Sequence, residues 1–147
     1  MDVPSFSLTL PSEARMLSVA RGFVEAVCQA YDLERSTMHA LIIVTGEAVT
    51  NIVRHAHQNC AGAQLELHLE IQDDAVILTF EDQGDPFDFD AVPQLPPGEL
   101  RIGGRGIYLM RALMDVVSHR PNANGKCGNV LRMVKRRQPN NLIRECG

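Results

Sequence analysis

The chain has 147 residues, of which 45% are hydrophobic, 22% are charged and 5% are aromatic, with no tryptophan. This length suits one domain with a single core, and the few aromatic residues argue against a stacking platform for nucleic acid. No run of about 18 apolar residues is present, which argues against a membrane-spanning helix. The N-terminal segment lacks an export signal and the four cysteines lack a C-x-x-C spacing, so we expect reduced thiols in a cytoplasmic protein.

The net charge of −4 is unevenly distributed along the chain. Residues 1–100 carry 4 basic and 16 acidic side chains, a net of −12, whereas residues 101–147 carry 10 basic and 2 acidic side chains, a net of +8. The basic region could meet phosphate or an acidic partner. The alternative is that the two halves neutralise each other across the fold, and charge alone leaves both possibilities open.

The first third of the chain predicts a strand followed by two helices. Polar and apolar residues alternate from Ser5 to Leu10, which predicts a half-buried strand. Ser12 follows and is a candidate cap for the next helix. Apolar residues then recur at helical spacing from Leu17 to Tyr31, and a second helix is predicted from about Glu34 to His57.

A hairpin and a long irregular segment come next. Residues Gln64–Gln72 alternate strictly, and two aspartates can turn the chain into a second strand at Ala75–Glu81. From residue 82 to residue 103 no periodicity remains, and the stretch contains four prolines. A loop of this length in so small a domain is usually functional or disordered.

The last third predicts a helix and two more strands. The helix begins after Gly103-Gly104 and carries apolar residues as far as Val116, and strands are predicted near Val116–Arg120 and Lys126–Arg136. The tail from Gln138 is polar. The order of elements therefore predicts an α+β protein, a two-layer sandwich in which three helices cover one face of a mostly antiparallel, mixed sheet.

The second predicted helix carries a polar stripe that packing does not require. Glu47, Asn51 and His55 follow an i, i+4, i+8 spacing beside the apolar arc. A Glu/Asn pair one turn apart can hold a hard cation through an oxygen and can activate a hydroxyl or water. The alternative is an ordinary polar pair on a solvated helix edge. Gly46 is costly in mid-helix, and the close approach of another group would explain it.

Two further segments interrupt the apolar pattern. Asp82 stands where a strand ends and Gly84 permits a turn, so the carboxylate could accept a hydrogen bond from an amine such as that of adenine. The alternative is simple turn chemistry. The segment 103–106, Gly-Gly-Arg-Gly, opens the last predicted helix, where backbone N–H groups and Arg105 could hold an anion. A plain glycine-rich loop is the alternative.

Two histidines and a cysteine near the end of the second predicted helix suggest zinc only weakly. His55 and His57 are separated by two positions, so their imidazoles face apart on a helix. Cys60 would be a third ligand, but no fourth is evident. We therefore expect no metal site at this cluster.

Together the three interruptions resemble one family. The segment 47–56, EAVTNIVRHA, is similar to the N box of the GHKL ATPase superfamily, which has the Bergerat fold. Residues 82–88, DQGDPFD, resemble its first Gly box, and residues 103–115, GGRGIYLMRALMD, resemble the second. The variants resemble most closely the bacterial anti-sigma-factor serine/threonine kinases, over about residues 5–137. Asp85-Pro86 replaces a glycine that is common in the wider superfamily, and this form is familiar in the anti-sigma branch.

This resemblance implies a role for each candidate residue. Asn51 would bind the Mg²⁺ that bridges the ATP phosphates, and Glu47 would be the general base for the accepting hydroxyl. Asp82 would bind the adenine amine, and Gly84 would shape the floor of the pocket. The residues beside the phosphates would be Gly104, Arg105 and Gly106. The loop 85–103 would be the ATP lid, and His55 would be structural.

The function implied by the resemblance is an ATP-dependent anti-sigma factor. It would phosphorylate a Ser or Thr of an anti-anti-sigma antagonist of the STAS class and sequester a sigma factor, usually as a homodimer. The catalytic domain would span residues 1–137, with residues 138–147 as a tail, and direct contact with nucleic acid or membrane is not expected. The alternative is a module that binds ATP and a sigma factor or another regulator without appreciable phosphoryl transfer.

Overall fold

The computed structural model describes residues 3–59, 62–84, 104–121 and 128–138. Within these residues the chain forms five strands and three α-helices, with a short 3-10 helix before the first α-helix. In chain order the elements are β1 (Ser5–Pro11), the 3-10 helix η1 (Ala14–Met16), α1 (Leu17–Ala30), α2 (Arg35–Asn59), β2 (Gln64–Ile71), β3 (Ala75–Asp82), α3 (Gly104–Leu113), β4 (Val116–Pro121) and β5 (Asn129–Arg136).

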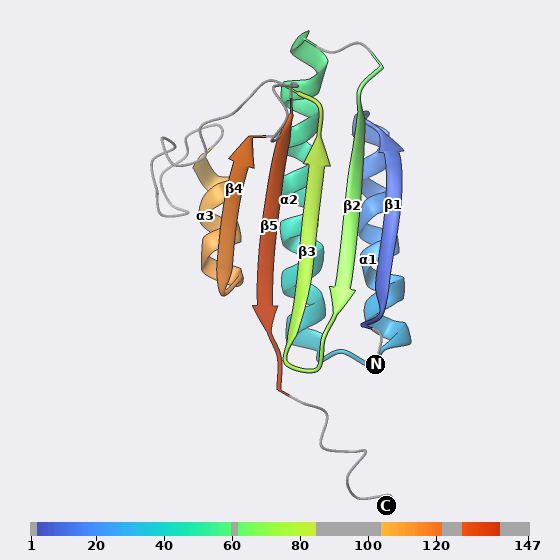
Figure 1. Ribbon diagram of the computed structural model, residues 1–147, viewed down its shortest axis with the longest axis vertical. Coiled ribbons are helices and arrows are strands. Elements are labelled where there is room, and N and C mark those ends of the chain that lie inside the picture. The colour runs from blue at the N-terminus through green and yellow to red at the C-terminus, as the bar shows by residue number, and fades with distance from the viewer. Residues whose placement is uncertain (1–2, 60–61, 85–103, 122–127, 139–147) are drawn as a thin grey trace, which may run out of the picture.

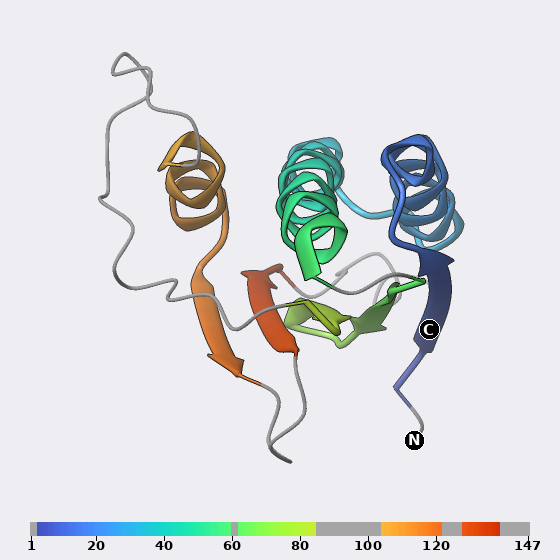
Figure 2. The ribbon, with the colours of Figure 1, turned by 90° about the horizontal axis from the view of Figure 1, so that it is seen from above.

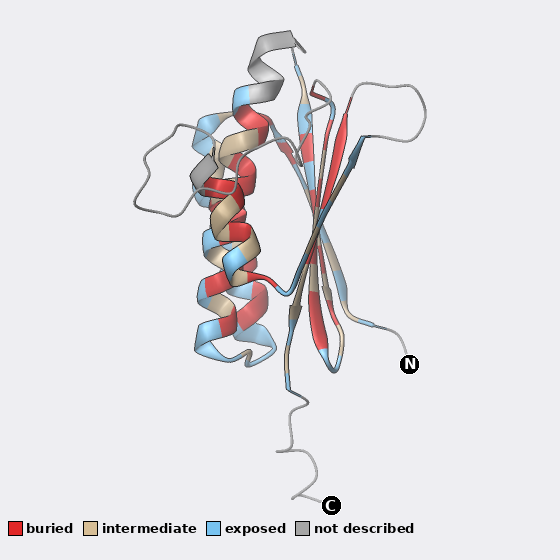
Figure 3. Cartoon of the chain, turned by 90° about the vertical axis from the view of Figure 1, so that its left-hand side faces the viewer, coloured by how far each residue is buried: buried red, intermediate tan, exposed pale blue. Residues whose placement is uncertain are grey.

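The strands form one sheet in the order β1-β2-β3-β5-β4. All three α-helices lie on one face of it, as Figures 1 and 2 show, and the edge-on view in Figure 3 separates the two layers. The predicted two-layer α+β sandwich is confirmed. The expectation of a mixed sheet is wrong for the described strands, because β5 enters between β3 and β4 and is antiparallel to both.

Alternation along the strands explains why one face of the sheet is covered. In β2 the leucines and Ile71 are buried, whereas Gln64 and Glu66 are exposed. Helices α1, α2 and α3 present apolar faces to this side, so that the core lies between the layers. Its largest fully buried side chains are Phe80, Leu41, Leu65, Leu67, Leu69, Leu78, Ile107, Met110 and Met133.

Helix α2 is long and apolar because it is the central helix of its layer. The stretch Arg35–Arg54 has a mean hydropathy of 1.2 and could cross a membrane by length and composition alone. However, 56% of this stretch is buried inside the fold, between α1 and α3 and against the sheet (Figure 2). Packing within the core therefore accounts for its hydrophobicity.

The predicted cap at Ser12 is wrong. The first helical turn is η1, preceded by Glu13, and no side chain caps it. The backbone N–H of Ser12 instead donates to the carbonyl of Ala63 at 3.0 Å, which extends the contact between β1 and the start of β2. Ser12 Oγ is buried and has no hydrogen-bond partner in the described part of the chain.

The remaining boundaries agree with the sequence pattern within a few residues. The last helix ends at Leu113 rather than reaching Val116, because Val116 already pairs with Val134 as the first residue of β4. Strand β5 begins at Asn129, and the two residues before Gly128 that were assigned to this strand, 126–127, lie outside the described residues.

Several ends meet at one pole of the molecule. In Figure 1 the C-terminal ends of α2, β3 and β4 and the N-terminal end of α3 all lie toward the top of the view. The segments that connect them there, 85–103 and 122–127, are outside the described residues. Two of the three polar interruptions of the sequence, those at the end of β3 and at the start of α3, therefore lie toward this pole.

Candidate functional site

The polar stripe of α2 meets the start of α3. Glu47 and Asn51 are both half-buried at the margin of the core. A Cβ placed on Gly106 would lie 2.8 Å from Glu47 Oε2 and 3.6 Å from Asn51 Nδ2. Glycine is therefore required at this position if the Glu47 carboxylate is to keep its place. Two sequence segments about sixty residues apart are thereby brought into direct contact.

The presence of Gly46 in the middle of α2, just before Glu47, is explained by a different contact. A Cβ on Gly46 would lie 2.6 Å from Nη2 of Arg21 in α1. The guanidinium thus passes close to the backbone of α2 at a position that carries no side chain. The expectation that a close approach explains this mid-helix glycine is confirmed, but the approaching group is a side chain of the protein itself.

The first turn of α3 supplies backbone donors. Gly104 and Arg105 lie in this turn, and Gly106 is buried against α2. The first N–H groups of an α-helix have no partner within the helix, and the helix dipole favours an anion beside them. The side chain of Arg105 is not among those described, nor is that of His55.

Asp82 is held in a buried polar network. It is 7% exposed and faces the helical layer, as do Leu78 and Phe80 before it in β3. Its Oδ1 accepts from the N–H of Gly84 at 2.8 Å and from Nδ2 of Asn129 at 3.1 Å. The Oδ1 of Asn129 in turn lies 3.0 Å from Nε2 of His119. Turn chemistry at Gly84 is thus present, but it is only part of the role of this carboxylate.

Asn129 and His119 were missed by the sequence analysis. A detectable signal exists in β5, where Asn129, Leu131 and Met133 alternate on the covered face. An asparagine in such an apolar row is unusual unless a buried partner satisfies it. Asn129 pairs in register with Asp82, so the partner could be named once the strand order was known.

The predicted residues therefore fall into two clusters, one at the start of α3 and one at the end of β3, and both of these element ends lie toward the top of Figure 1. Glu47, Asn51 and Gly106 form a contact between α2 and α3, and Asp82 with Gly84 forms a second cluster at the end of β3 (Figure 1). The segment 85–103, predicted to be a lid, lies outside the described residues.

The described basic residues of the last third mostly serve other purposes than an anion site. Lys135 Nζ donates to the carbonyl of Leu113 at 2.8 Å, where a cation suits the C-terminal end of α3. Arg132 and Arg136 alternate with core residues of β5 and lie on the uncovered face of the sheet. Glu66 and Glu70 of β2 lie on that same face. Basic and acidic side chains thus share the uncovered face of the sheet.

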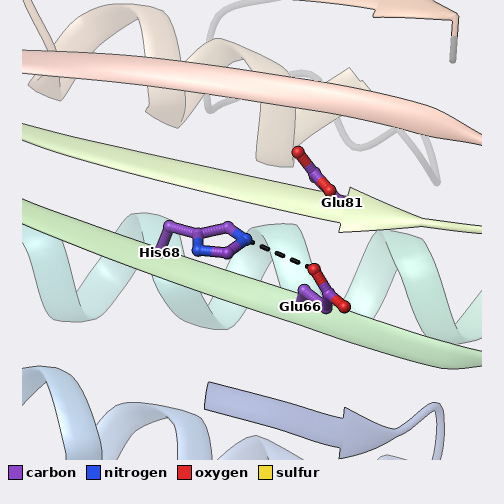
Figure 4. Close-up of side chains that lie close together, drawn as sticks. All are labelled: Glu66, His68 and Glu81. Atoms are coloured by element: carbon purple, nitrogen blue, oxygen red, sulfur yellow. Dashed lines mark ion pairs between the residues drawn. The ribbon is translucent and has the colours of Figure 1, made fainter. Parts of the chain in front are cut away.

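A separate polar cluster lies on the uncovered face of the sheet. Glu66 and Glu81 are directly opposed on β2 and β3, and His68 is two residues from Glu66 (Figure 4). One ligand-type atom of each lies within 4.8 Å of the others. His68 Nε2 pairs with Glu66 Oε2 at 3.4 Å, and its Nδ1 lies 2.9 Å from Ser7 Oγ. These side chains are exposed or half-buried, so water and mutual pairing satisfy them.

The cysteine chemistry is that of a buried thiol. Cys28 of α1 is fully buried and free. Burial raises the pKa of its thiol from 9.0 to about 11, and the negative charge of Glu25 adds to the rise. Cys60 lies outside the described residues, as do the side chains of His55 and His57. The expectation that this cluster holds no metal therefore stays a prediction.

Comparison with known proteins gives a consistent result. A family model described as "Histidine kinase-like ATPase domain" matches residues 10–135. Among curated proteins, the serine-protein kinase RsbW of Staphylococcus epidermidis is 30% identical over 143 residues, covering 91% of this chain and 89% of the relative. That of Bacillus subtilis is 27% identical over 118 residues, covering 75% and 74%.

Solved structures agree on the fold. The crystal structure of the RsbU and RsbW domains of a Mycobacterium tuberculosis protein superposes with a TM-score of 0.64 at 16% identity, covering 90% of this chain and 32% of that one. The catalytic domain of histidine kinase ThkA superposes with a TM-score of 0.54 at 12% identity, covering 95% of this chain and 100% of that one.

Proposed function

Because the chain belongs to the histidine kinase-like ATPase domain family, we propose that its two polar clusters form one site for ATP with Mg²⁺. The observation that carries this proposal is the contact of Gly106 with Glu47 and Asn51. It brings a carboxylate, a carboxamide and the backbone donors of a helix start together. Packing alone has no need for that combination at the margin of a core.

The donor set fits a magnesium nucleotide. Asn51 offers an uncharged oxygen of the kind that Mg²⁺ accepts beside phosphate ligands. The N–H groups of the first turn of α3, with Gly104 and Gly106, would hold phosphate oxygens, and Arg105 would add a charge-assisted contact. Bound Mg²⁺ would neutralise charge on the phosphates.

Asp82 would hold the base. A carboxylate has room for about four hydrogen bonds, and two of the donors to Asp82 are Gly84 and Asn129. Both donors bind Oδ1 and so hold that oxygen at the end of β3. A carboxylate in this position suits the exocyclic amine of adenine, with Gly84 leaving space for the ring.

Glu47 would be the catalytic base. It lies beside the N-terminal turn of α3, next to the position proposed for the phosphates, and a carboxylate there can accept the proton of a hydroxyl as that oxygen attacks. The neighbouring Gly106 keeps the space that the carboxylate occupies. The residue thus acts on the partner's hydroxyl rather than on the nucleotide.

The acceptor is proposed to be a serine or threonine of a partner protein. Relatives at 26–30% identity are named serine-protein kinases, and the motifs resemble the anti-sigma-factor kinases. We propose that the chain acts in the cytoplasm as a homodimer, that it sequesters a sigma factor, and that phosphorylation releases its STAS-class antagonist. The catalytic domain is taken as residues 1–137.

Radiolabelled ATP tests this function directly. Incubated with Mg²⁺ and a candidate STAS antagonist, the wild-type chain should transfer label to the partner. Glu47→Ala should reduce transfer at least about a hundredfold, as removal of a general base does, while ATP binding stays largely intact. Glu66→Ala, the same change on the uncovered face, is the matched control and should transfer normally. Normal transfer by Glu47→Ala would refute the assignment of the base.

A second candidate function uses the same residues. The chain could bind ATP and a sigma factor without phosphoryl transfer, because nucleotide binding requires nearly the same side chains. In the labelling experiment this module would retain ATP while no tested antagonist became labelled. Label on the partner would exclude it.

A further inference from the structure

A row of three hydrogen-bonding side chains crosses the covered face of the sheet. Asp82 of β3 and Asn129 of β5 are directly opposed, and His119 of β4 lies diagonally beyond, opposite Leu131. Asp82 and Asn129 are 7% and 5% exposed, and His119 is half-buried. The separations are 3.1 Å from Asn129 Nδ2 to Asp82 Oδ1 and 3.0 Å from His119 Nε2 to Asn129 Oδ1.

The chemistry of these groups fixes the direction of each hydrogen bond. An ionised carboxylate only accepts, so the amide of Asn129 must turn its NH₂ toward Asp82. The amide oxygen then faces His119, and the ring nitrogen that meets it must carry a proton. His119 therefore donates from Nε2. The hydrogen bond from His119 supports the orientation of the Asn129 amide, and that amide in turn holds Oδ1 of Asp82.

We infer that His119 is a positioning residue for base recognition, acting through Asn129 on the carboxylate of Asp82. The inference rests on the proposed adenine site. If the donor at His119 is removed, the Asn129 amide loses the hydrogen bond from β4 that supports its orientation toward Asp82. A less firmly held amide would keep its NH₂ group on the carboxylate for less of the time, because each rotation brings its oxygen toward Asp82, and in a buried site that repulsion is only weakly screened. The carboxylate would then leave the position in which it accepts from an amine.

The experiment compares nucleotides that differ at the base. ATP carries the exocyclic amine that Asp82 would accept, and ITP carries a carbonyl at that position. The wild-type chain should prefer ATP in a calorimetric titration with Mg²⁺. His119→Leu should weaken ATP binding about fivefold, the loss expected for one hydrogen bond, and should leave ITP binding unchanged. The ATP-to-ITP preference therefore falls, which a general loss of structure would not produce.

Three further variants keep the test decisive. His119→Gln places an amide N–H at a similar reach and should restore most of the preference for ATP. Asn129→Asp sets a second carboxylate beside Asp82 and should cause a larger loss than His119→Leu. His68→Leu makes the same substitution on the uncovered face and should match the wild-type chain. Thermal denaturation identifies any variant whose fold has failed, in which case the Gln rescue decides the question.

The outcomes separate the two proposals. A wild-type chain that binds ATP and ITP equally would overturn the adenine site, and the inference with it. A wild-type preference that His119→Leu retains in full would overturn the role of His119 alone. Equal losses in His119→Leu and His119→Gln would also overturn that role, because the donated hydrogen bond would then be irrelevant.

Discussion

The two faces of the sheet carry similar side chains in different surroundings. On the covered face Asp82, Asn129 and His119 are joined by directed hydrogen bonds at 3.0–3.1 Å. On the uncovered face Glu66, His68 and Glu81 gather within 4.8 Å and remain open to water. Burial makes an unsatisfied polar group costly, so the first cluster must hold one geometry. The second can rearrange freely, and its pairs contribute little to stability.

The strongest expected contrast between burial and exposure concerns a thiol. Because the pKa of Cys28 is about 11 instead of 9.0, its thiolate population at pH 8 should be about a hundredfold lower than that of an unfolded cysteine. Alkylation by iodoacetamide, followed by mass spectrometry of the Cys28 peptide, should be slow until denaturant is added. Rapid labelling in the native state would contradict the burial of this residue.

The same pKa shift predicts a pH dependence of stability. The folded state holds the thiol proton more tightly than the unfolded state does. The contribution of Cys28 is therefore fully present below pH 9 and is lost as the pH rises toward about 11. Urea denaturation of Cys28→Ala should show a shallower decline across this range than that of the wild-type chain.

The next contrast compares how much the cluster on the covered face and the cluster on the uncovered face contribute to stability. Asn129→Ala removes the hydrogen bonds of this side chain to Asp82 and His119 and should lower the free energy of unfolding by about 1–3 kcal/mol. His68→Ala removes only exposed contacts and should cost less than about 1 kcal/mol. Urea denaturation measures both. Equal losses would mean that burial does not distinguish the two faces.

The contact between α2 and α3 offers a more selective perturbation. Gly106→Ala puts a methyl group 2.8 Å from Glu47 Oε2, and the flexible carboxylate is the part that yields. We expect phosphoryl transfer to fall about tenfold or more because the base is displaced, with little change in melting temperature. A drop in stability that accounts for the whole loss of transfer would contradict this interpretation.

The smallest expected effect compares two helical glycines. A Cβ on Gly22 of α1 meets nothing within 4 Å, whereas one on Gly46 meets Arg21. Gly22→Ala should raise the free energy of unfolding by about 0.5–1 kcal/mol through helix propensity. Gly46→Ala should gain less, because Arg21 must move. Urea denaturation distinguishes them, and an equal gain would show that the guanidinium moves at no cost.

The sequence predicted the structure correctly where a single hydrophobic periodicity runs through a whole segment. The alternation in Gln64–Ile71 predicts the core face of β2 correctly, and the stripe of Glu47 and Asn51 was recognised because it interrupts an apolar helix. Asn129 and His119 were missed because their role depends on which strands are neighbours. Strand order is a tertiary property that no local pattern of β4 or β5 contains. Ser12 was assigned wrongly for a related reason, since its backbone pairs with Ala63 across the sheet.

The most direct test of the account is calorimetric titration with Mg·ATP. The wild-type chain and Glu81→Gln, which alters only the uncovered face, should bind with the same affinity. Asn51→Ala and Asp82→Asn each remove a proposed contact to the nucleotide complex, and each should weaken binding about tenfold or more. Unchanged affinity in both of these variants would contradict the claim that the contact between α2 and α3 and the cluster at the end of β3 form one nucleotide site.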